Sequence, residues 1–249
     1  MTSTSELETI LYGINAIATL IEHEPNRVQR VLYAHRGARG AKGAREALIK
    51  AAEASGIEVA SVRERQIDHY VPDAQHQGVL AFVRARDFMS WEQLCQPDTH
   101  SLLLALDQVT DPRNFGAILR SAEAFGVSGI LITSNRCARP GPTAARTSAG
   151  MSELIPIAIE TNLSKSLSFA HAHGYQIVGA ALGGAPISKV DWDVPTVIVI
   201  GAEGRGLREK TRTHCSELVT IPMFGRAESL NAAVAAGVIL YEATRHRSI

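Results

Sequence analysis

The sequence lacks several features that would each point to a particular class of protein. Its formal net charge is +0, so bulk charge does not announce a nucleic-acid partner. No apolar run reaches the ~20 residues that a membrane-spanning helix needs. The start, MTSTSELETI, has no basic stretch followed by an apolar one, so we expect no signal peptide. Together these absences favour a cytoplasmic protein with no membrane partner.

Cysteine is scarce and scattered. Cys95, Cys137 and Cys215 are odd in number and far apart, and no C-x-x-C pair occurs. This pattern suits a reducing compartment and offers neither a disulfide framework nor a cysteine metal site. We therefore expect no bound metal.

The familiar phosphate-binding motifs are also absent. There is no G-x-x-x-x-G-K-[ST], and the glycines from Gly201 to Gly206 are spaced G-x-x-G-x-G instead of G-x-G-x-x-G. A nucleoside triphosphate or dinucleotide site is therefore disfavoured, and with it a Rossmann-like oxidoreductase.

What the sequence does contain is an alternation of helical and strand patterns, with hydrophobic residues making up 45% of the chain. We expect helices at 9–24, 43–55, 64–70, 115–125, 162–172 and 230–245. We expect strands at 28–34, 57–62, 79–83, 101–106, 129–133, 155–159, 176–181, 196–200 and 219–221. Unbroken apolar strands joined by helices are typical of α/β folds with parallel sheets. We divide the chain into a smaller α/β domain at 1–84, a linker at 85–100 and a second α/β domain at 101–249.

The helix expected at the end of the chain is apolar on every side. No charged residue occurs from Leu230 to Tyr241. Such a helix is buried on both sides, either within one domain or against a second subunit. Ser229 is a good candidate for its N-cap, because a hydroxyl can accept a hydrogen bond from a free amide of the first turn.

A glycine-rich basic loop at 35–45 lies in the first domain. From Arg27 to Lys50 there are seven Lys or Arg residues and one acidic residue, Glu46. Such a patch can bind the phosphates of RNA, or it can be a solvated loop. The residues alone leave both interpretations open.

Three polar or glycine-rich loops follow expected strands, at 107–114, 201–207 and 221–231. Ligands of open parallel sheets bind beyond the carboxyl ends of the strands, where these loops lie. Their polar residues also have plain structural interpretations. Asn114, Ser229 and Asn231 suit helix starts, Arg120 suits a surface ion pair, and Glu203 suits an exposed turn.

The same three loops, in this order, resemble the three motifs of the SPOUT superfamily of knotted methyltransferases. More narrowly, they resemble those of the RNA ribose 2′-O-methyltransferases of the SpoU family. The matching stretches are DPRNFGAILR at 111–120, VIGAEGRGL at 199–207, and IPM at 221–223 with SLN at 229–231. Residues 146–156 fit the same family. At the N-terminal end, Leu11–Ala16 and His76–Gly78 resemble the ribosomal-protein-L30e-like substrate-binding domain.

The resemblance implies a mostly parallel sheet whose C-terminal segment threads a trefoil knot. It implies a homodimer that uses S-adenosylmethionine (AdoMet) to methylate a ribose 2′-hydroxyl. Because the match runs from end to end, the implied substrate is one guanosine of 23S rRNA. A tRNA ribose methylase of the same family and a non-catalytic RNA-binding factor for ribosome assembly are the alternatives.

Residue roles follow from the same resemblance. Arg120 would act on the ribose hydroxyl, and Asn114 would position Arg120 or the ribose. The other matched residues at the catalytic site would order the loops and the substrate: Glu203, Ser229 and Asn231. The residues expected to bind AdoMet are Ala181, Leu182, Gly183, Gly201, Glu203, Gly206, Ile221, Met223, Ser229 and Leu230. Those expected to bind RNA are Arg36, Arg39, Lys42, Arg45, Arg113 and Arg146.

Overall fold

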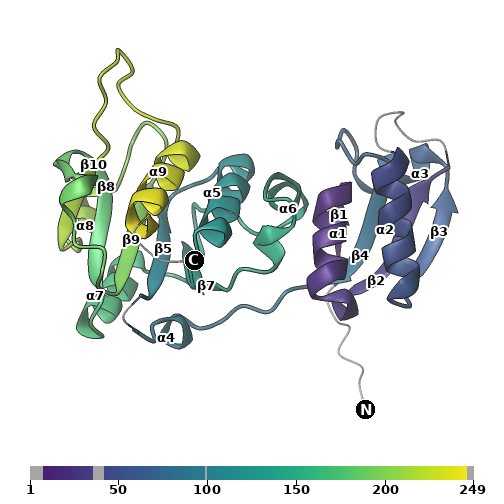
Figure 1. The fold of residues 1–249 in the computed structure, drawn as a ribbon, viewed down its shortest axis with the longest axis horizontal. Coiled ribbons are helices and arrows are strands. Elements are labelled where there is room, and N and C mark those ends of the chain that lie inside the picture. Colours follow the sequence, from purple (N-terminus) through teal and green to yellow (C-terminus); the bar gives the residue numbers. More distant parts are fainter. Residues whose placement is uncertain (1–7, 36–41, 99, 246–249) are drawn as a thin grey trace. The chain divides into compact units, whose positions relative to one another are not determined.

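The structure is a computed structural model that describes residues 8–35, 42–98 and 100–245 (Figure 1). It divides into two compact units. The first comprises residues 1–87 and 140–154, and the second comprises residues 88–139 and 155–249. The chain therefore crosses between the units three times, at 87/88, 139/140 and 154/155.

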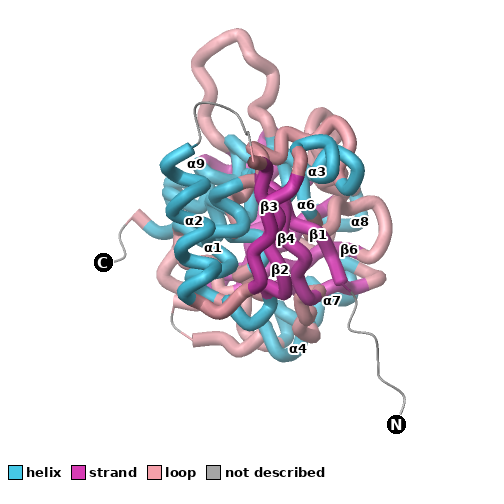
Figure 2. The backbone as a smooth tube through the Cα atoms, turned by 90° about the vertical axis from the view of Figure 1, so that its right-hand side faces the viewer, coloured by secondary structure: helices cyan, strands magenta, loops and turns pink. Residues whose placement is uncertain are grey.

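The first unit is built on a four-stranded sheet with helices on both faces (Figure 2). The strands run in the order β1-β4-β2-β3, in which β2 is parallel to β3 and β4 is antiparallel to both of its neighbours. Their bounds are β1 (Glu8–Tyr12), β2 (Val28–Ala34), β3 (Glu58–Val62) and β4 (Val79–Arg84).

Alternation along these strands decides which helix covers which face. Val31 and Ala81 lie in one cluster with α1 (Ile14–His23) and α2 (Lys42–Ala54). The next residue along β2, Leu32, lies in the opposite cluster with Ile67 of α3 (Glu64–Tyr70). A short 3-10 helix, η1 (Pro25–Arg27), joins α1 to β2. The sheet is therefore covered by apolar side chains on both faces.

The helix expected over 9–24 is wrong at its start. The chain first forms β1, which pairs with β4, and α1 begins only at Ile14. Gly13 separates the two elements with φ 91°, a conformation that residues with a Cβ rarely adopt. The amide of Ile14 donates to Gln77 Oε1 at 3.0 Å. The two N-terminal stretches that resemble a substrate-binding domain therefore lie together.

Residues 140–154 pack with the first unit although they come much later in the chain. They contain α6 (Pro142–Thr147) and the short 3-10 helix η3 (Met151–Glu153). Arg27 donates to the Glu153 carboxylate at 2.7 Å. A Cβ at Gly150 would lie 2.6 Å from the Cβ of Thr19, so glycine is needed for this close packing.

The division into units thus differs from the boundaries that we expected. Residues 140–154 leave the 101–249 domain for the first unit. Much of the expected linker at 85–100 belongs to the second unit, where it forms α4 (Trp91–Leu94). Trp91 anchors it, because its indole is buried and donates to the carbonyl of Ser166 at 2.9 Å.

The second unit is built on a six-stranded sheet in the order β10-β8-β9-β5-β6-β7, and every pair of neighbours is parallel. The strands are β5 (Leu102–Asp107), β6 (Gly129–Thr133), β7 (Ile157–Glu160), β8 (Gln176–Pro186), β9 (Thr196–Gly201) and β10 (Glu217–Thr220). All residues of β5, β6 and β9 are buried, as expected for strands covered on both faces.

Helices lie on both faces of this sheet. On one face, α4 and α7 (Leu163–Ala172) contribute to a core with Leu103, Leu131 and Val197 of the strands. On the other, α5 (Pro112–Ala124) packs against α9 (Ala232–Thr244), the last helix (Figure 1). The remaining helical segments are η4 (Ile187–Lys189) and α8 (Glu209–Arg212). The expected α/β class with a mostly parallel sheet is confirmed.

Within the part of the chain that the structure describes, no helix combines the length and the apolar character needed to cross a membrane.

Candidate active site

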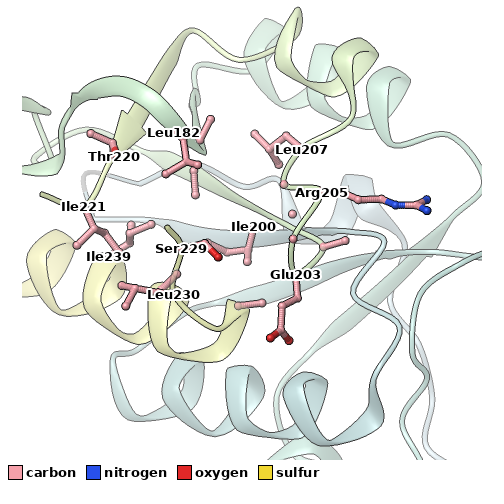
Figure 3. A pocket seen from close by; sticks show the side chains of 18 of the residues that line it. Leu182, Ile200, Glu203, Arg205, Leu207, Thr220, Ile221, Ser229, Leu230 and Ile239 are labelled. Atoms are coloured by element: carbon pink, nitrogen blue, oxygen red, sulfur yellow. The ribbon is translucent and has the colours of Figure 1, made fainter. Parts of the chain in front are cut away.

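A pocket of about 220 Å³ lies at the carboxyl ends of β9 and β10, beside the middle of β8 (Figure 3). One wall is the middle of β8, a second is the loop from Gly201 to Leu207 after β9, and a third is the connection from β10 into α9. Two of the three loops singled out in the sequence thus meet at one place, as the topology of an open parallel sheet dictates.

The walls are small, apolar and rich in main chain. Leu182, Ile221 and Leu230 present apolar side chains to the pocket (Figure 3). Gly201 and Gly206 can present only backbone to it. A Cβ at Gly201 would collide with the backbone of Gly206. Glycine at position 201 therefore lets the two sides of the loop approach closely.

Asn114, Glu203 and Asn231 form a hydrogen-bonded cluster that joins all three loops. Asn114 Nδ2 donates to Glu203 Oε2 at 3.0 Å. Asn231 Nδ2 donates to Asn114 Oδ1 at 3.0 Å and to Glu203 Oε2 at 3.2 Å. One residue from each motif therefore holds the other two.

The start of α9 fixes the direction of these bonds. Asn231 Oδ1 accepts from the amides of Ala233 and Val234, so the other atom of this side-chain amide must be the donor. Asn114 then accepts from Asn231 through its oxygen and donates to Glu203 through its nitrogen. Glu203 Oε2 therefore accepts two hydrogen bonds, one from each asparagine.

The N-cap of the last helix is thus Asn231, and the prediction of Ser229 was wrong. The helix begins at Ala232, two residues later than a Ser229 cap would require. Ser229 is exposed and lines the pocket instead. At the start of α5 the cap is Asp111, whose carboxylate accepts from the amide of Arg113, so Asn114 does not cap that helix.

Nine of the ten residues expected at the AdoMet site line the pocket: Ala181, Leu182, Gly201, Glu203, Gly206, Ile221, Met223, Ser229 and Leu230. Gly183, the tenth, does not line it, although it directly follows Leu182 in β8. Arg120 is exposed on α5 and does not line the pocket either. It forms no hydrogen bond or ion pair with any described residue, so the surface ion pair considered for it is not formed.

The residues expected to bind RNA are dispersed. Arg36 and Arg39 lie outside the described residues. Lys42 is exposed at the start of α2, but Arg45 on the same helix is only 8% exposed. Arg113 is exposed and paired with Asp111 at 3.2 Å. Arg146 is exposed on α6 and donates to Gln75 Oε1 at 2.7 Å.

His76 has a structural role in the turn before β4. It is buried, its Nδ1 accepts from the amide of Gly78 at 3.0 Å, and its Nε2 lies 2.9 Å from Asp68 Oδ1. These contacts hold the turn that leads into β4.

The three thiols are poor nucleophiles at neutral pH. Burial raises the pKa of Cys137 and of Cys215 to about 11, and burial together with Glu92 raises the pKa of Cys95 to about 12. A thiolate is the reactive form of cysteine, so none of them suits covalent catalysis. Among the described residues, no three His, Cys, Asp or Glu side chains gather as the ligands of a metal ion would.

The sequence alone missed several residues at this place. Arg205, Arg212 and Ile239 also line the pocket. Asp107, at the end of β5, is fully buried and accepts from Arg208, which directly follows the second motif. A carboxylate that ends an apolar strand was the available signal for Asp107, since an aspartate is rarely buried without a partner.

The family of this chain follows from its match to models of known protein families. Residues 101–241 match the model of the SpoU rRNA Methylase family. The chain belongs to this family. Residues 10–89 match a second model, described as RNA 2′-O ribose methyltransferase substrate binding. The resemblance to the SpoU family that the motifs indicated is confirmed.

Similar proteins and solved structures match this chain over nearly its whole length. The 23S rRNA (guanosine-2′-O-)-methyltransferase RlmB of Pseudomonas syringae pv. tomato is 38% identical over 251 residues, which cover 98% of each chain. The AdoMet-bound rRNA methyltransferase of Sinorhizobium meliloti gives a TM-score of 0.78 at 27% identity, covering 97% of this chain and 88% of that one. The SpoU methyltransferase AviRb of Streptomyces viridochromogenes, in complex with AdoMet, gives 0.77 at 29% identity, with 96% and 90% covered.

Proposed function

We propose that this protein transfers the methyl group of AdoMet to the ribose 2′-oxygen of one guanosine in 23S rRNA. The observation that carries the proposal is the cluster of Asn114, Glu203 and Asn231, which joins the three family motifs beside a glycine-lined pocket. The likeness to RlmB over nearly the whole chain favours 23S rRNA as the substrate. Ribosomal RNA as a substrate in turn favours action in the bacterial cytoplasm.

The pocket suits AdoMet by its chemistry. Main-chain groups of Gly201–Gly206 can recognise a flat purine and its ribose through backbone hydrogen bonds. Leu182 and Ile221 offer apolar contact to rings and aliphatic carbon. Bound there, AdoMet would supply an electrophilic methyl group on a sulfonium. The residues that we assign to its binding are those expected from the motifs, with Gly183 contributing backbone at the edge of the site.

The ribose hydroxyl is a poor nucleophile until it loses or shares its proton, so the site must assist it. Arg120 is the residue that we assign to this task. A guanidinium stays protonated at neutral pH, which makes a general-base role awkward. Arg120 instead orients the hydroxyl and the neighbouring phosphate and stabilises the forming alkoxide. Its freedom from partners among the described residues leaves its donors open for RNA.

Asn114, Glu203 and Asn231 order the loops around the reacting groups. Their shared hydrogen bonds fix the second motif against the start of α5, the helix that carries Arg120. Ser229, exposed at the edge of the pocket, contacts the substrates directly. This proposal gives the cluster a positioning role and Arg120 the chemical one.

RNA would be held by basic side chains on both units. Exposed Lys42, Arg113 and Arg146 remain in this proposal, together with Arg36 and Arg39. We withdraw Arg45 from it, because its buried guanidinium is not open to a phosphate. Each phosphate contact that is removed should reduce the salt dependence of RNA binding by roughly 0.7–0.9 in slope.

We further propose that the protein is a homodimer through α9. This helix buries Ala236, Ile239 and Leu240 against its own unit. Its opposite stripe stays exposed in the single chain, with Val234 52% and Tyr241 58% exposed. An apolar stripe of this kind is typical of an interface.

Gly237 makes no tight contact with the described residues, since the nearest atom to a Cβ added there would be Ser121 Oγ at 3.7 Å. Sedimentation at micromolar concentration should give a dimer, and a monomer would contradict this proposal.

The alternative substrates and the non-catalytic alternative are separated by one experiment. Methyl-labelled AdoMet is incubated with the protein and either unmodified 23S rRNA or bulk tRNA. Label in 23S rRNA alone supports the proposal, and label in tRNA alone supports a tRNA ribose methylase. RNA binding without label supports a non-catalytic assembly factor.

A further inference from the structure

An ion pair between a buried aspartate and a half-exposed arginine lies at the ends of the loop that forms one wall of the pocket. Asp107, the last residue of β5, is 0% exposed. Its Oδ2 accepts from the backbone amide of Arg208 at 3.0 Å, and its Oδ1 accepts from Arg208 Nε at 2.6 Å. One carboxylate thus binds both the main chain and the side chain of a residue 101 positions away.

Asp107 fixes both ends of the pocket loop. At the first end, it is the register partner of Gly201, where β9 finishes. At the second end, it binds Arg208, directly after the loop closes at Leu207. Between these ends, the amide of Gly206 donates to the carbonyl of Ala202 at 2.8 Å. The loop is therefore narrow, and Asp107 anchors both of its ends.

The pair also sets the start of the next helix. The carbonyl of Arg208 accepts from the amides of Thr211 and Arg212, both at 2.9 Å, and so opens α8. Arg212 lines the pocket. Residues on both sides of Arg208 therefore contribute to the pocket, and their positions depend on where Asp107 holds it.

Stability alone does not require this arrangement. Removing a carboxylate from water is costly, and apolar side chains packed at such a position are often at least as stabilising as an ion pair. Every other residue of β5 is a buried Leu or Ala, which shows that the strand can be covered without charge. The ion pair adds a fixed geometry. Because one carboxylate binds two donors of Arg208, it fixes the positions of both the backbone amide and the guanidinium.

We infer that Asp107 and Arg208 are positioning residues for AdoMet, which hold the wall from Gly201 to Arg212 in its binding form. Neither side chain is assigned a contact with the ligand. The inference rests on the proposed function for the identity of that ligand. It predicts that breaking the pair loosens the AdoMet site while leaving RNA binding by other surfaces intact.

The test compares Arg208→Gln, Arg208→Lys and Asp107→Asn with a matched control. The control is Glu24→Gln, which breaks the partly exposed pair of Glu24 with Arg27 in the first unit. AdoMet affinity is measured by calorimetry without RNA. RNA affinity and the melting temperature are measured on the same samples. Arg208 is the primary site because its side chain is 46% exposed, so its substitution is compatible with folding.

Arg208→Gln and Asp107→Asn should weaken AdoMet binding by about 10- to 100-fold, as expected when a hydrogen bond to a charged group is lost. RNA affinity should stay within about twofold of that of the unmodified protein, because a twofold change in affinity corresponds to less binding free energy than one hydrogen bond contributes. Arg208→Lys should restore part of the AdoMet affinity, because it keeps the charge, and Glu24→Gln should change neither affinity.

Two results would overturn the inference. One is an Arg208→Gln protein that binds AdoMet as the unmodified protein does. The other is an equal loss of AdoMet and RNA affinity with a lowered melting temperature, which indicates a general structural defect. If the unmodified protein itself fails to bind AdoMet, the proposed function fails as well, so the two failures are distinguishable.

Discussion

Asn231 Nδ2 lies 3.2 Å from Glu203 Oε2, while Oδ1 of the same side chain caps α9. One amide therefore stabilises the start of the last helix and holds the carboxylate of the pocket loop. These two tasks use different atoms, so substitutions can separate them.

Asn231→Asp should keep the helix cap and damage the site. Aspartate is as good an N-cap as asparagine, so the free energy of unfolding should change little through the cap. Its second oxygen cannot donate to Glu203, and it places a second negative charge beside that carboxylate. Turnover should therefore fall. Asn231→Ala, by comparison, should lose both tasks and cost about 1 kcal/mol in the free energy of unfolding. Denaturant melts and initial rates are measured on both variants. An equal loss of stability in the two variants would contradict this separation of the cap from the site.

Gly201→Ala should abolish AdoMet binding. The added methyl group would collide with the backbone of Gly206, which cannot move without opening the pocket loop. Gly225→Ala is the matched control, because a Cβ there meets no atom within 4 Å. Equilibrium dialysis with labelled AdoMet checks both, and unchanged binding by Gly201→Ala would contradict the geometry of the loop.

Arg120→Ala should lower turnover by about 10²–10³-fold, the range found when one donor to a developing oxyanion is removed. AdoMet affinity should be nearly unchanged, since Arg120 does not line the pocket. Single-turnover rates and calorimetry on the same preparation measure the two effects. Near-normal turnover would remove Arg120 from the mechanism.

The cysteines should react slowly with alkylating reagents near neutral pH. Burial raises the pKa of Cys137 and Cys215 to about 11, so each thiol remains protonated in the folded protein over most of the accessible range. Because the folded pKa exceeds the ordinary thiol pKa of 9.0, their contribution to stability is complete below pH 9 and is lost as the pH rises through about 11. Mass spectrometry after iodoacetamide treatment at about pH 8 should show little modification, with glutathione as the reactive control. Rapid alkylation of the folded protein at that pH would contradict this prediction.

The sequence predicted most strands and helices because their apolar patterns are strong. The buried strands of the six-stranded sheet appear as unbroken apolar runs, and α5 alternates apolar and polar residues with helical spacing. The error at 9–12 arose because Thr9–Tyr12 continue the apolar pattern of α1, while the strand exists only through pairing with β4. The placement of 140–154 with the first unit depends on contacts such as Arg27 with Glu153, which are remote in sequence.

The candidate site was predicted from motif resemblance, and the pocket gathers most of the residues expected at the AdoMet site. Composition and spacing alone did not choose between helix caps and site residues. For Asn231 the structure shows that the choice was false, because it is both a cap and a member of the cluster. Asp107 and Arg208 were missed because their partnership depends on the pairing of β5 with β9, which no local pattern reveals.

The most direct test of the account is to map the methyl group at nucleotide resolution. Unmodified 23S rRNA is treated with the protein and AdoMet, and ribose 2′-O-methylation is read along the whole molecule. The account predicts one newly methylated guanosine ribose, absent when Gly201→Ala replaces the unmodified protein. Methylation of a base, methylation of many scattered riboses, or no methylation at all would contradict it.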